Sequence, residues 1–492
     1  MQTVDENNTD IIINKGFQYH QEGLLDDAEN LYMEALSLDK NNAGLYNLIG
    51  VLKFQKLDVD SAIGYIQKAI SISKSEYYYE SLFQVLIRKE DFEQILSYEK
   101  EVTTLYPKNF TLLFNLGYAY KKLGNFDRAL MYYEKALEVD PTSYEGWYNL
   151  ANLYRTMQRA YEAVSAMKVC HKLKPKDDET SYYLGVSYMR IKNYAKGLPL
   201  FEKRLSKKVA FASHNKTTPN LIREDNFWRG ENIKNKNIFV YYEAGFGDLI
   251  MFARYLPLLA KRCKKVTLMC HKELTPLFKI NKHLGVDEFQ DRFIPNNNID
   301  VDVHASILSL PYLLGLKGDD IFVTPEGYIV PDMDMVEEYR KKYFDNDKIK
   351  VGIKWRGNTT LERNRTIPAE LFNQLMQRDD TQFYSFQTLE GSEDTSKLEG
   401  IIDIGKDLTD FSQTAAALRN LDIVICNDTS LAHLAGAMRI PCWVMLPAES
   451  DWRWHTNLTK CDWYESVRLF RQKDCGDWQS VFDQVLTEMQ PE

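Results

Sequence analysis

The feature that most constrains this chain is a 34-residue period in its N-terminal part. Gly16 and Gly50 lie 34 residues apart, and Gly117, Ala151 and Gly185 follow one another at the same spacing. A fixed period of this length is typical of a repeat array in which each repeat is one supersecondary unit. A second series of small residues keeps the same period: Ala28 and Ala62, then Ala129, Ala163 and Gly197.

The residue types at these positions indicate pairs of antiparallel helices. Glycine or alanine at two fixed positions lets the helices approach closely, and a proline such as Pro141 or Pro175 ends the second helix. The stretch 147–175 reads W-x-x-L-A-x-x-Y, then Ala163, then Pro175, and resembles the tetratricopeptide pattern. We therefore expect an all-helical superhelix of about six repeats over residues 1–205, starting near residues 9, 43, 77, 110, 144 and 178.

One repeat of this array departs from the period. Gly50 and Gly117 are 67 residues apart, one short of two repeats, so we expect a degenerate repeat with one deletion between them. A single repeat cannot bury its apolar face alone, and stacking on its neighbours is therefore obligatory. Because such arrays serve as interaction platforms, we expect the repeats to hold a protein or peptide.

Composition excludes several classes of function. The 492 residues include 61 Lys+Arg and 70 Asp+Glu, a formal charge of −9, whereas a nucleic-acid binder usually carries a basic domain. No apolar run approaches the ~18 residues that a membrane-spanning helix needs, and the polar start MQTVDENNTD is unlike a secretory signal. The seven cysteines are odd in number and never spaced C-x-x-C, which favours neither disulfides nor zinc. We expect a cytoplasmic protein with no nucleic-acid partner and no membrane span.

After about residue 206 the period gives way to alternating strands and helices. Residues 206–235 read as a linker, and IFVYY (238–242) and VTLMC (266–270) as buried parallel strands joined by a helix that Pro257 kinks or splits. Helices are expected at 334–344, PAELFNQLMQ, FSQTAAALRN and SLAHLAGAMRI, and strands at 350–355, 382–387, 421–426 and 441–446. This order predicts two Rossmann-like α/β halves, 236–335 and 345–492, whose ligands bind at the carboxyl ends of the strands.

A glycine-rich turn follows the first of these strands. Gly245 and Gly247 allow close backbone approach to a ligand at a helix N-terminus, and Asp248 follows them. A dinucleotide-binding turn would carry a third glycine at Ile250, and an acid where Cys270 ends the second strand, so a nicotinamide enzyme fits poorly. From these residues alone, an ordinary helix N-cap is the favoured interpretation of Asp248.

Two segments of the second half could bind phosphate. The loop WRGNTTLERNRT (355–366) carries Arg356, Arg363 and Arg365, and arginine binds phosphate bidentately; a solvated basic loop is the alternative. CNDTSLAHLAGA (426–437) puts polar residues at a strand-to-helix junction, where backbone amides suit a pyrophosphate. The alternative there is a capping cluster with a core histidine, and a catalytic Ser–His pair is disfavoured for want of an orienting acid.

Two further groups are weaker candidates. DWRWHTN (451–457) places Trp452, Arg453 and Trp454 together as a platform for a sugar or base, with tertiary packing of the indoles as the alternative. Asp300 and Asp302 form a D-x-D in a strand-like run that ends at His304, but a lone D-x-D is a poor metal signal. We expect no metal ion.

Residues 221–480 resemble a bacterial family in which tetratricopeptide repeats precede a glycosyltransferase family 9, heptosyltransferase-like domain. The matching stretches include IFVYYEAGFGDLIMFARYLPLL, VGIKWRGN with RNRTIP, and NDTSLAHLAGAMRIPCWVMLPAESDWRWHTN. The resemblance implies a GT-B fold and inverting, metal-independent transfer from a nucleotide sugar, with no other cofactor.

The resemblance also implies roles for particular residues. Asp248 falls on the proposed general base, and Asp428, Thr429, Ser430 and His433 fall on the donor-binding D-[TS]-x-x-x-H motif, where Ser430 replaces the usual glycine. No counterpart of the family's phosphate-contacting lysine is clear, and Arg363 or Arg365 is the candidate replacement. The other donor-binding candidates are Gly245, Gly247, Arg356, Asn358 and Gln387, and the sugar or acceptor platform is His304 with Trp452, Arg453 and Trp454.

The sequence thus predicts a glycosyltransferase that moves a sugar to an acceptor hydroxyl, on a protein held by the repeats. Two alternatives stay open. One is a non-catalytic scaffold with a degenerate transferase-like domain, and the other is a transferase acting on lipopolysaccharide or another glycan.

Overall fold

The computed structural model describes residues 2–206, 226–291, 301–322, 327–357, 364–456 and 459–489. By its internal contacts the chain forms two compact units, Met1–Tyr154 and Arg155–Glu492. Most of the predicted linker 206–235 lies outside the described residues. The domain boundaries predicted at residues 205, 235, 335 and 345 come from sequence patterns, whereas the division into two units comes from packing. Those predicted boundaries stay predictions.

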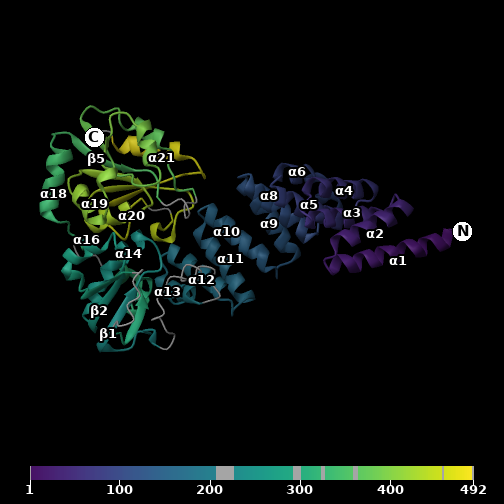
Figure 1. Ribbon diagram of the computed structural model, residues 1–492, viewed down its shortest axis with the longest axis horizontal. Coiled ribbons are helices and arrows are strands. Elements are labelled where there is room, and N and C mark those ends of the chain that lie inside the picture. The colour runs from purple at the N-terminus through teal and green to yellow at the C-terminus, as the bar shows by residue number, and fades with distance from the viewer. Residues whose placement is uncertain are drawn as a thin grey trace. The chain divides into compact units, whose positions relative to one another are not determined.

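The first unit consists of helices that pack in consecutive pairs (Figure 1). Repeats expected near residues 43, 110 and 144 begin at α3, α8 and α10, and α1 starts earlier than the predicted residue 9. The helices are α1 (Gln2–Gln21), α2 (Leu25–Leu38), α3 (Ala43–Gln55), α4 (Val59–Ile72), α5 (Glu76–Lys89), α6 (Phe92–Ser97), α7 (Glu99–Leu105), α8 (Phe110–Lys122), α9 (Phe126–Val139) and α10 (Tyr144–Thr156).

Small residues hold the paired helices together. A Cβ added to Gly50 would lie 2.5 Å from Cγ1 of Ile66, and one added to Gly117 would lie 2.7 Å from Cδ1 of Tyr133. Both distances are too short for any side chain, so the period of glycines found in the sequence is the period of close helix contacts. The second-series residues Ala28, Ala62 and Ala129 are fully buried.

The degenerate repeat has a broken second helix. After α5 the chain forms two short helices, α6 and α7, which meet at Tyr98. A deletion of one residue shifts the apolar face by about 100° on a helix, and a break lets both halves turn that face inward. Ile95 of α6 and Val102 of α7 are accordingly buried.

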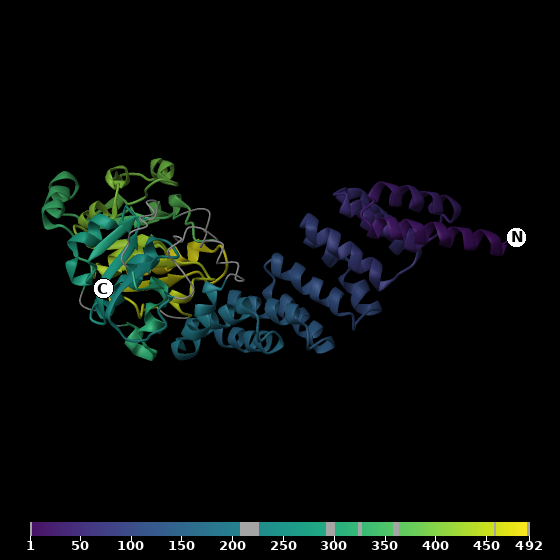
Figure 2. The same ribbon diagram turned by 60° about the horizontal axis from the view of Figure 1, so that its bottom comes forward.

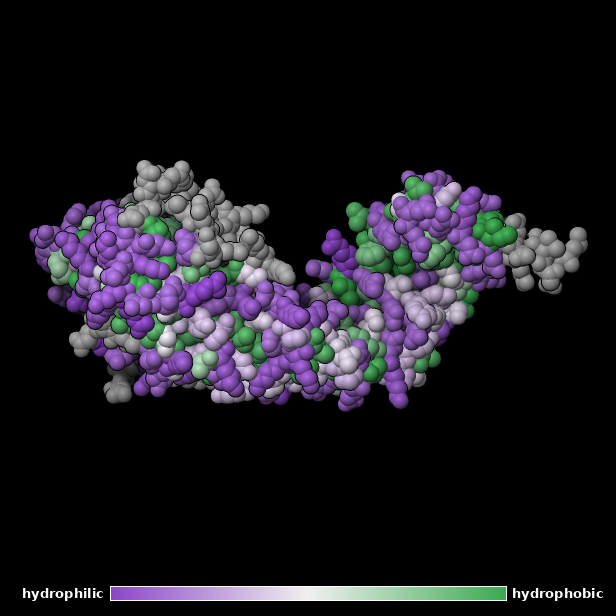
Figure 3. All heavy atoms as spheres, turned by 90° about the horizontal axis from the view of Figure 1, so that it is seen from below, coloured by the Kyte–Doolittle hydropathy of each residue, from purple (hydrophilic) through white to green (hydrophobic). Residues whose placement is uncertain are grey.

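Apolar side chains also reach the surface of the repeats. Leu57 is 77% exposed and Tyr77 is 67% exposed. Figure 3 shows hydrophobic groups dispersed among hydrophilic ones over the visible face of these helices. Scattered exposed apolar residues are ordinary on protein surfaces, so hydropathy alone does not mark a binding face.

The second unit starts with the last helices of the array and continues into two sheets. The helices are α11 (Ala160–Leu173), α12 (Asp178–Arg190) and α13 (Tyr194–Phe201), followed by the 3₁₀ turn η1 (Glu202–Leu205). Tyr194 of α13 contacts both sheet regions, because its ring packs on Phe322 and its hydroxyl lies 2.6 Å from Nε2 of His455. One hydrophobic core runs from Tyr182 of α12 into both sheet regions, and another lies within the second sheet region.

The first sheet is wholly parallel, with strand order β3-β2-β1-β4. The helix expected around Pro257 is split, because α14 ends at Phe252 and α15 begins at Leu256. The strands are β1 (Ile233–Tyr241), β2 (Cys263–Cys270), β3 (Glu288–Asp291) and β4 (Val303–Ser306), and the helices are α14 (Phe246–Phe252), α15 (Leu256–Ala260), α16 (Thr275–Ile280) and α17 (Leu310–Leu313).

The second sheet is also parallel, with strand order β10-β9-β8-β5-β6-β7 (Figures 1 and 2). Counted from β5, this is the 3-2-1-4-5-6 order of doubly wound sheets. The strands are β5 (Ile349–Lys354), β6 (Thr381–Ser385), β7 (Ile402–Asp403), β8 (Ile423–Asn427), β9 (Cys442–Leu446) and β10 (Val467–Arg471), and the helices are α18 (Met333–Tyr339), α19 (Phe411–Leu418), α20 (Ser430–Ala437) and α21 (Trp478–Glu488).

Three details of the second region differ from the sequence predictions. The last strand expected from the sequence is 441–446, whereas the structure has one more parallel strand, β10, beside it. The helix expected from Pro368 is only a 3₁₀ turn, Ala369–Gln374. The helix expected over 334–344 is α-helical to Tyr339 and continues as a π-helical turn, Arg340–Phe344.

Candidate functional site

The two predicted ligand turns lie against each other. Helix α14, which follows β1, packs on α20, which follows β8, so the carboxyl ends of these strands share one region (Figure 1). A Cβ added to Gly247 would lie 2.7 Å from Cδ2 of His433 and 3.5 Å from Cα of Ser430. Glycine is therefore required at residue 247 because the second turn occupies the space of a side chain.

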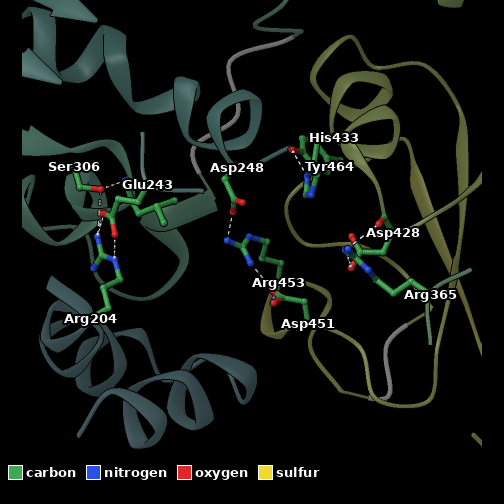
Figure 4. Close-up of polar contacts among 11 residues, drawn as sticks. Arg204, Glu243, Asp248, Ser306, Arg365, Asp428, His433, Asp451, Arg453 and Tyr464 are labelled. Atoms are coloured by element: carbon green, nitrogen blue, oxygen red, sulfur yellow. Dashed lines mark hydrogen bonds and ion pairs between the residues drawn. The ribbon is translucent and has the colours of Figure 1, made fainter. Parts of the chain in front are cut away.

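Asp248 points across this junction toward Arg453 (Figure 4). Its Oδ1 accepts a hydrogen bond from Nη2 of Arg453, whose Nη1 lies 2.6 Å from Oδ1 of Asp451. The Arg453 side chain is only 13% exposed. One guanidinium thus joins a carboxylate of the first region to a carboxylate of the second.

The position of Asp248 differs from that of a helix cap. The N-cap of α14 is Gly245, and Asp248 lies within the first turn of the helix. Burial raises the pKa of the Asp248 carboxyl, while the Arg453 guanidinium acts in the opposite direction. A carboxylate with a raised pKa is a stronger base than an ordinary aspartate, as a proton acceptor requires.

The second turn begins where β8 ends. Asn427 and Asp428 are buried, and Thr429 is the N-cap of α20, with extended backbone but no capping bond from its side chain within the described residues. Arg365 reaches this turn from the loop after β5, and its Nη1 donates to the Asp428 carbonyl at 3.2 Å and lies 3.7 Å from the Asp428 carboxylate. Burial raises the pKa of Asp428, and Arg365 opposes that rise.

His433 is a buried residue of α20, 5% exposed. Its Nδ1 lies 3.1 Å from the Tyr464 hydroxyl, and its ring stacks on Trp454 with centroids 5.2 Å apart. Burial lowers its pKa to about 3, and the nearby Arg453 adds to that effect. The imidazole is therefore neutral at pH 7 and fits the predicted core histidine as well as a ligand-contacting one.

This lowered pKa predicts a pH dependence of stability. Between pH 6.5 and about 3 the unfolded chain binds a proton at His433 that the folded chain does not, so acidification destabilises the fold. The contribution is complete above pH 6.5 and falls by at most about 1.4 kcal/mol per pH unit below it. Urea unfolding of the wild type and of His433→Gln at pH 7 and pH 5 measures this effect. The stability advantage of the wild type is expected to shrink at pH 5, and an advantage that is constant with pH would contradict the assignment.

The predicted platform for a sugar does not have exposed rings. Trp452 is 5% exposed and packs on Phe201 and Trp463, and Trp454 is 1% exposed beneath His433. Both indoles are therefore packed in the protein interior, as the alternative to an open platform expected. His304, the fourth member, is buried within β4 between the rings of Phe227 and Tyr241.

Other predicted donor-binding residues have structural partners. The Gln387 side chain is buried, and its Oε1 accepts from the Arg356 N–H at 3.0 Å while its Nε2 donates to the Glu390 carbonyl at 2.7 Å. It ties the end of β6 to the loop after β5 and is not open to a ligand. Nη1 of Arg356 lies 3.9 Å from Oε1 of Glu393. Asn358 and Arg363 lie outside the described residues.

Asp302 has a structural role as well. It precedes β4, and its carboxylate accepts the Asn237 N–H at 2.7 Å, while Asp300 lies outside the described residues. In the part of the chain that the structure describes, no three His, Cys, Asp or Glu side chains are grouped to hold a metal ion. Among the described helices, none is both long enough and apolar enough to cross a bilayer.

Sequence reasoning missed several polar residues near the site. Asp451 and Tyr464 were not singled out, although each bonds a residue that was, Arg453 and His433 respectively. Arg204 and Glu243 also escaped notice, although they form a buried ion pair beside the first turn. The position of Glu243, two residues after a strand and two before the glycine-rich turn, is the signal that could have pointed to it.

Comparison with known proteins identifies the repeats. Sequence models of the tetratricopeptide repeat match residues 9–42, 111–143 and 132–164, which lie on the helix pairs described above. The N-terminal helices are tetratricopeptide repeats. The prediction of tetratricopeptide repeats is thus confirmed, and the number of repeats and their extent over residues 1–205 stay predictions.

Relatives found by sequence comparison cover only part of the chain. Protein FlbA of Caulobacter vibrioides is 24% identical over 306 residues, which are 53% of this chain and 48% of FlbA. The BBSome complex member BBS4 of Bos taurus is 21% identical over 202 residues, 34% of this chain and 39% of BBS4. The chain thus spans less than half of each of these relatives.

Solved structures similar to part of this chain include YrrB and pilF. The tetratricopeptide protein YrrB, described as having an unusual peptide-binding site, matches 36% of this chain and 92% of its own length at 22% identity, with a TM-score of 0.31. Pseudomonas aeruginosa pilF matches 41% of this chain and 92% of its own length at 17% identity, with a TM-score of 0.37.

Proposed function

We propose that this chain is a scaffold whose tetratricopeptide repeats hold a protein or peptide and whose α/β unit binds a nucleotide-linked sugar. The repeat matches and the relatives support the first part. The observation that carries the second part is the contact between the turn at Gly247 and the turn at Ser430 and His433. A ligand held at the carboxyl end of β8 would therefore lie next to Asp248.

The finer proposal is a GT-B, family 9-like glycosyltransferase. Two parallel sheets, one of them with the strand order of a doubly wound fold, agree with such an architecture. The donor diphosphate would lie at the N-terminus of α20, where backbone N–H groups and Arg365 supply positive potential. The acceptor hydroxyl would approach from the first region.

The proposed reaction is a single displacement. The acceptor oxygen attacks the anomeric carbon and forms the new C–O bond, while the bond from that carbon to the diphosphate breaks. The acceptor proton passes to Asp248, and the nucleoside diphosphate leaves with the bonding electrons. Oδ1 of Asp248 is engaged by Arg453, so Oδ2 is the oxygen proposed to accept the proton.

The non-catalytic alternative is favoured by a specific observation. Arg453 already neutralises Asp248 in an ion pair. A carboxylate held in this way is a poor proton acceptor, so the site would bind a ligand without turning it over. Incubating the purified chain with UDP-, GDP-, ADP- and CMP-linked sugars and an extract that supplies acceptors distinguishes the two. Binding with acceptor-dependent release of the nucleotide supports the transferase, binding without release supports the scaffold, and no binding contradicts the proposed sugar-nucleotide site.

Arg365 provides a test of the donor side. Arg365→Ala is expected to raise the dissociation constant for the sugar nucleotide by about 10- to 100-fold, because a charge-assisted hydrogen bond contributes ~1.5–3 kcal/mol. Isothermal titration calorimetry measures this dissociation constant. The matched control is Arg439→Ala, which changes an arginine beyond the C-terminal end of α20. Equal affinities of Arg365→Ala and the wild type would remove Arg365 from the site.

A further inference from the structure

Arg204 ends the repeat array and inserts into the first sheet region. It lies in η1, immediately after α13, and is only 3% exposed. Its Nε and Nη2 hold the two carboxylate oxygens of Glu243 at 3.1 and 2.7 Å. Figure 4 shows the guanidinium directed at Glu243 and Ser306, apart from the Asp248–Arg453 pair.

The remaining donors of this guanidinium are also used. Nη1 donates to Glu202 at 2.7 Å and to the Phe201 carbonyl at 3.2 Å, and Nη2 lies 2.8 Å from Oγ of Ser309 and 3.4 Å from Oγ of Ser306. A buried arginine with a bidentate carboxylate and satisfied donors has a fixed geometry. Arg204 is thus a rigid connection rather than a solvated surface charge.

Arg204 lies where β1 and β4 end side by side. Glu243 follows the end of β1 and Ser306 ends β4, and β1 and β4 are neighbours in the sheet. From β1 the chain adds β2 and then β3 on one side of the sheet, and it then returns to add β4 on the other side of β1. The direction in which strands are added therefore reverses between β1 and β4. This is the switch point where open α/β sheets usually bind ligands, and here a residue of the repeat array fills it.

The turn that carries Asp248 begins at the same point. Glu243 precedes Gly245, the N-cap of α14, by two residues, and Asp248 lies in the first turn of that helix. A shift of Glu243 would therefore be transmitted over few backbone bonds to Asp248 and to Gly247, which lies against His433.

We propose that Arg204 is a positioning residue: by holding Glu243 and Ser306 at the switch point of the first sheet, it fixes the turn that presents Asp248. The last repeat is then part of the site rather than a tethered neighbour. The identity of the reaction rests on the proposed function, but the positioning of the turn does not.

Hydrogen exchange and kinetics of the full chain test this role. Arg204→Met is expected to speed amide exchange over residues 245–252 by at least about tenfold, because the turn loses its anchor, with residues 478–488 of α21 unaffected. Turnover of the sugar nucleotide is expected to fall by about 10²-fold with little change in its KM. Arg340→Met, which removes an equally bidentate but exposed arginine–glutamate pair with Glu337, is the control and should change neither quantity.

A double variant separates positioning from stability. Arg204→Met leaves Glu243 buried without its cation, whereas Arg204→Met with Glu243→Met replaces the whole pair by apolar groups and should recover most of the thermal stability. Exchange over 245–252 should stay fast in this double variant. Exchange at the wild-type rate in a stable double variant would overturn the positioning proposal, whereas absence of turnover in the wild type would overturn only the proposed transferase activity.

Discussion

Replacing Asp248 by asparagine is expected to lower the rate of sugar transfer by about 10²–10⁴-fold, the usual contribution of a general base. Asparagine has nearly the same shape and can still accept a hydrogen bond from Arg453, but it cannot take the acceptor proton. Arg453 keeps Asp451 as a partner at 2.6 Å, so the fold should lose little stability. Nucleotide release at saturating donor measures the rate.

Two controls make this result specific. Asp345→Asn removes an aspartate that pairs with Arg340 at 3.1 Å on the surface, and it should leave the rate unchanged. The affinity of Asp248→Asn for the sugar nucleotide should stay near that of the wild type, because Asp248 is assigned to the acceptor side. Full activity of Asp248→Asn would refute its role as the base.

Replacing Trp454 by alanine is expected to reduce the free energy of unfolding by about 3–5 kcal/mol, as is usual for a buried tryptophan. Its indole is 1% exposed and supports the ring of His433, so the variant leaves a cavity beneath α20. Urea unfolding followed by circular dichroism measures the loss, and Trp454→Phe should restore part of it by keeping the stacked ring.

Tyr161→Ala is the matched control for this variant. Tyr161 belongs to the same compact unit but is 71% exposed, so its loss should change the free energy of unfolding by no more than about 0.5 kcal/mol. If Trp454→Ala were equally harmless and instead weakened sugar-nucleotide binding, the indole would be the open platform expected from the sequence and not a packed core residue.

The repeats were the most predictable part of the fold. Gly50 and Gly117 mark close contacts between neighbouring helices, and such contacts are local, so the sequence period carries them directly. The strands of the α/β region were also largely predictable, because buried parallel strands are continuous apolar runs. The strand β10 was missed because Arg468 and Arg471 interrupt the apolar run of its sequence VRLFR.

The site was less predictable, because its contacts join distant parts of the chain. The residues Gly247 and His433 were both candidates, and the structure brings them together. The pairing of Asp248 with Arg453 spans 205 residues, and no local pattern predicts it. Whether an indole such as Trp452 is exposed or packed depends likewise on Phe201 from the repeat array.

Titration of the wild-type chain with UDP-, GDP-, ADP- and CMP-linked sugars by calorimetry tests the central claim most directly. We expect one of the UDP-, GDP- or ADP-linked classes to bind saturably and the corresponding nucleoside diphosphate to compete with it, because the diphosphate, which CMP-linked sugars lack, provides the main contacts proposed at the N-terminus of α20. If none of the four classes bound at millimolar concentration, the α/β unit would not be a sugar-nucleotide site.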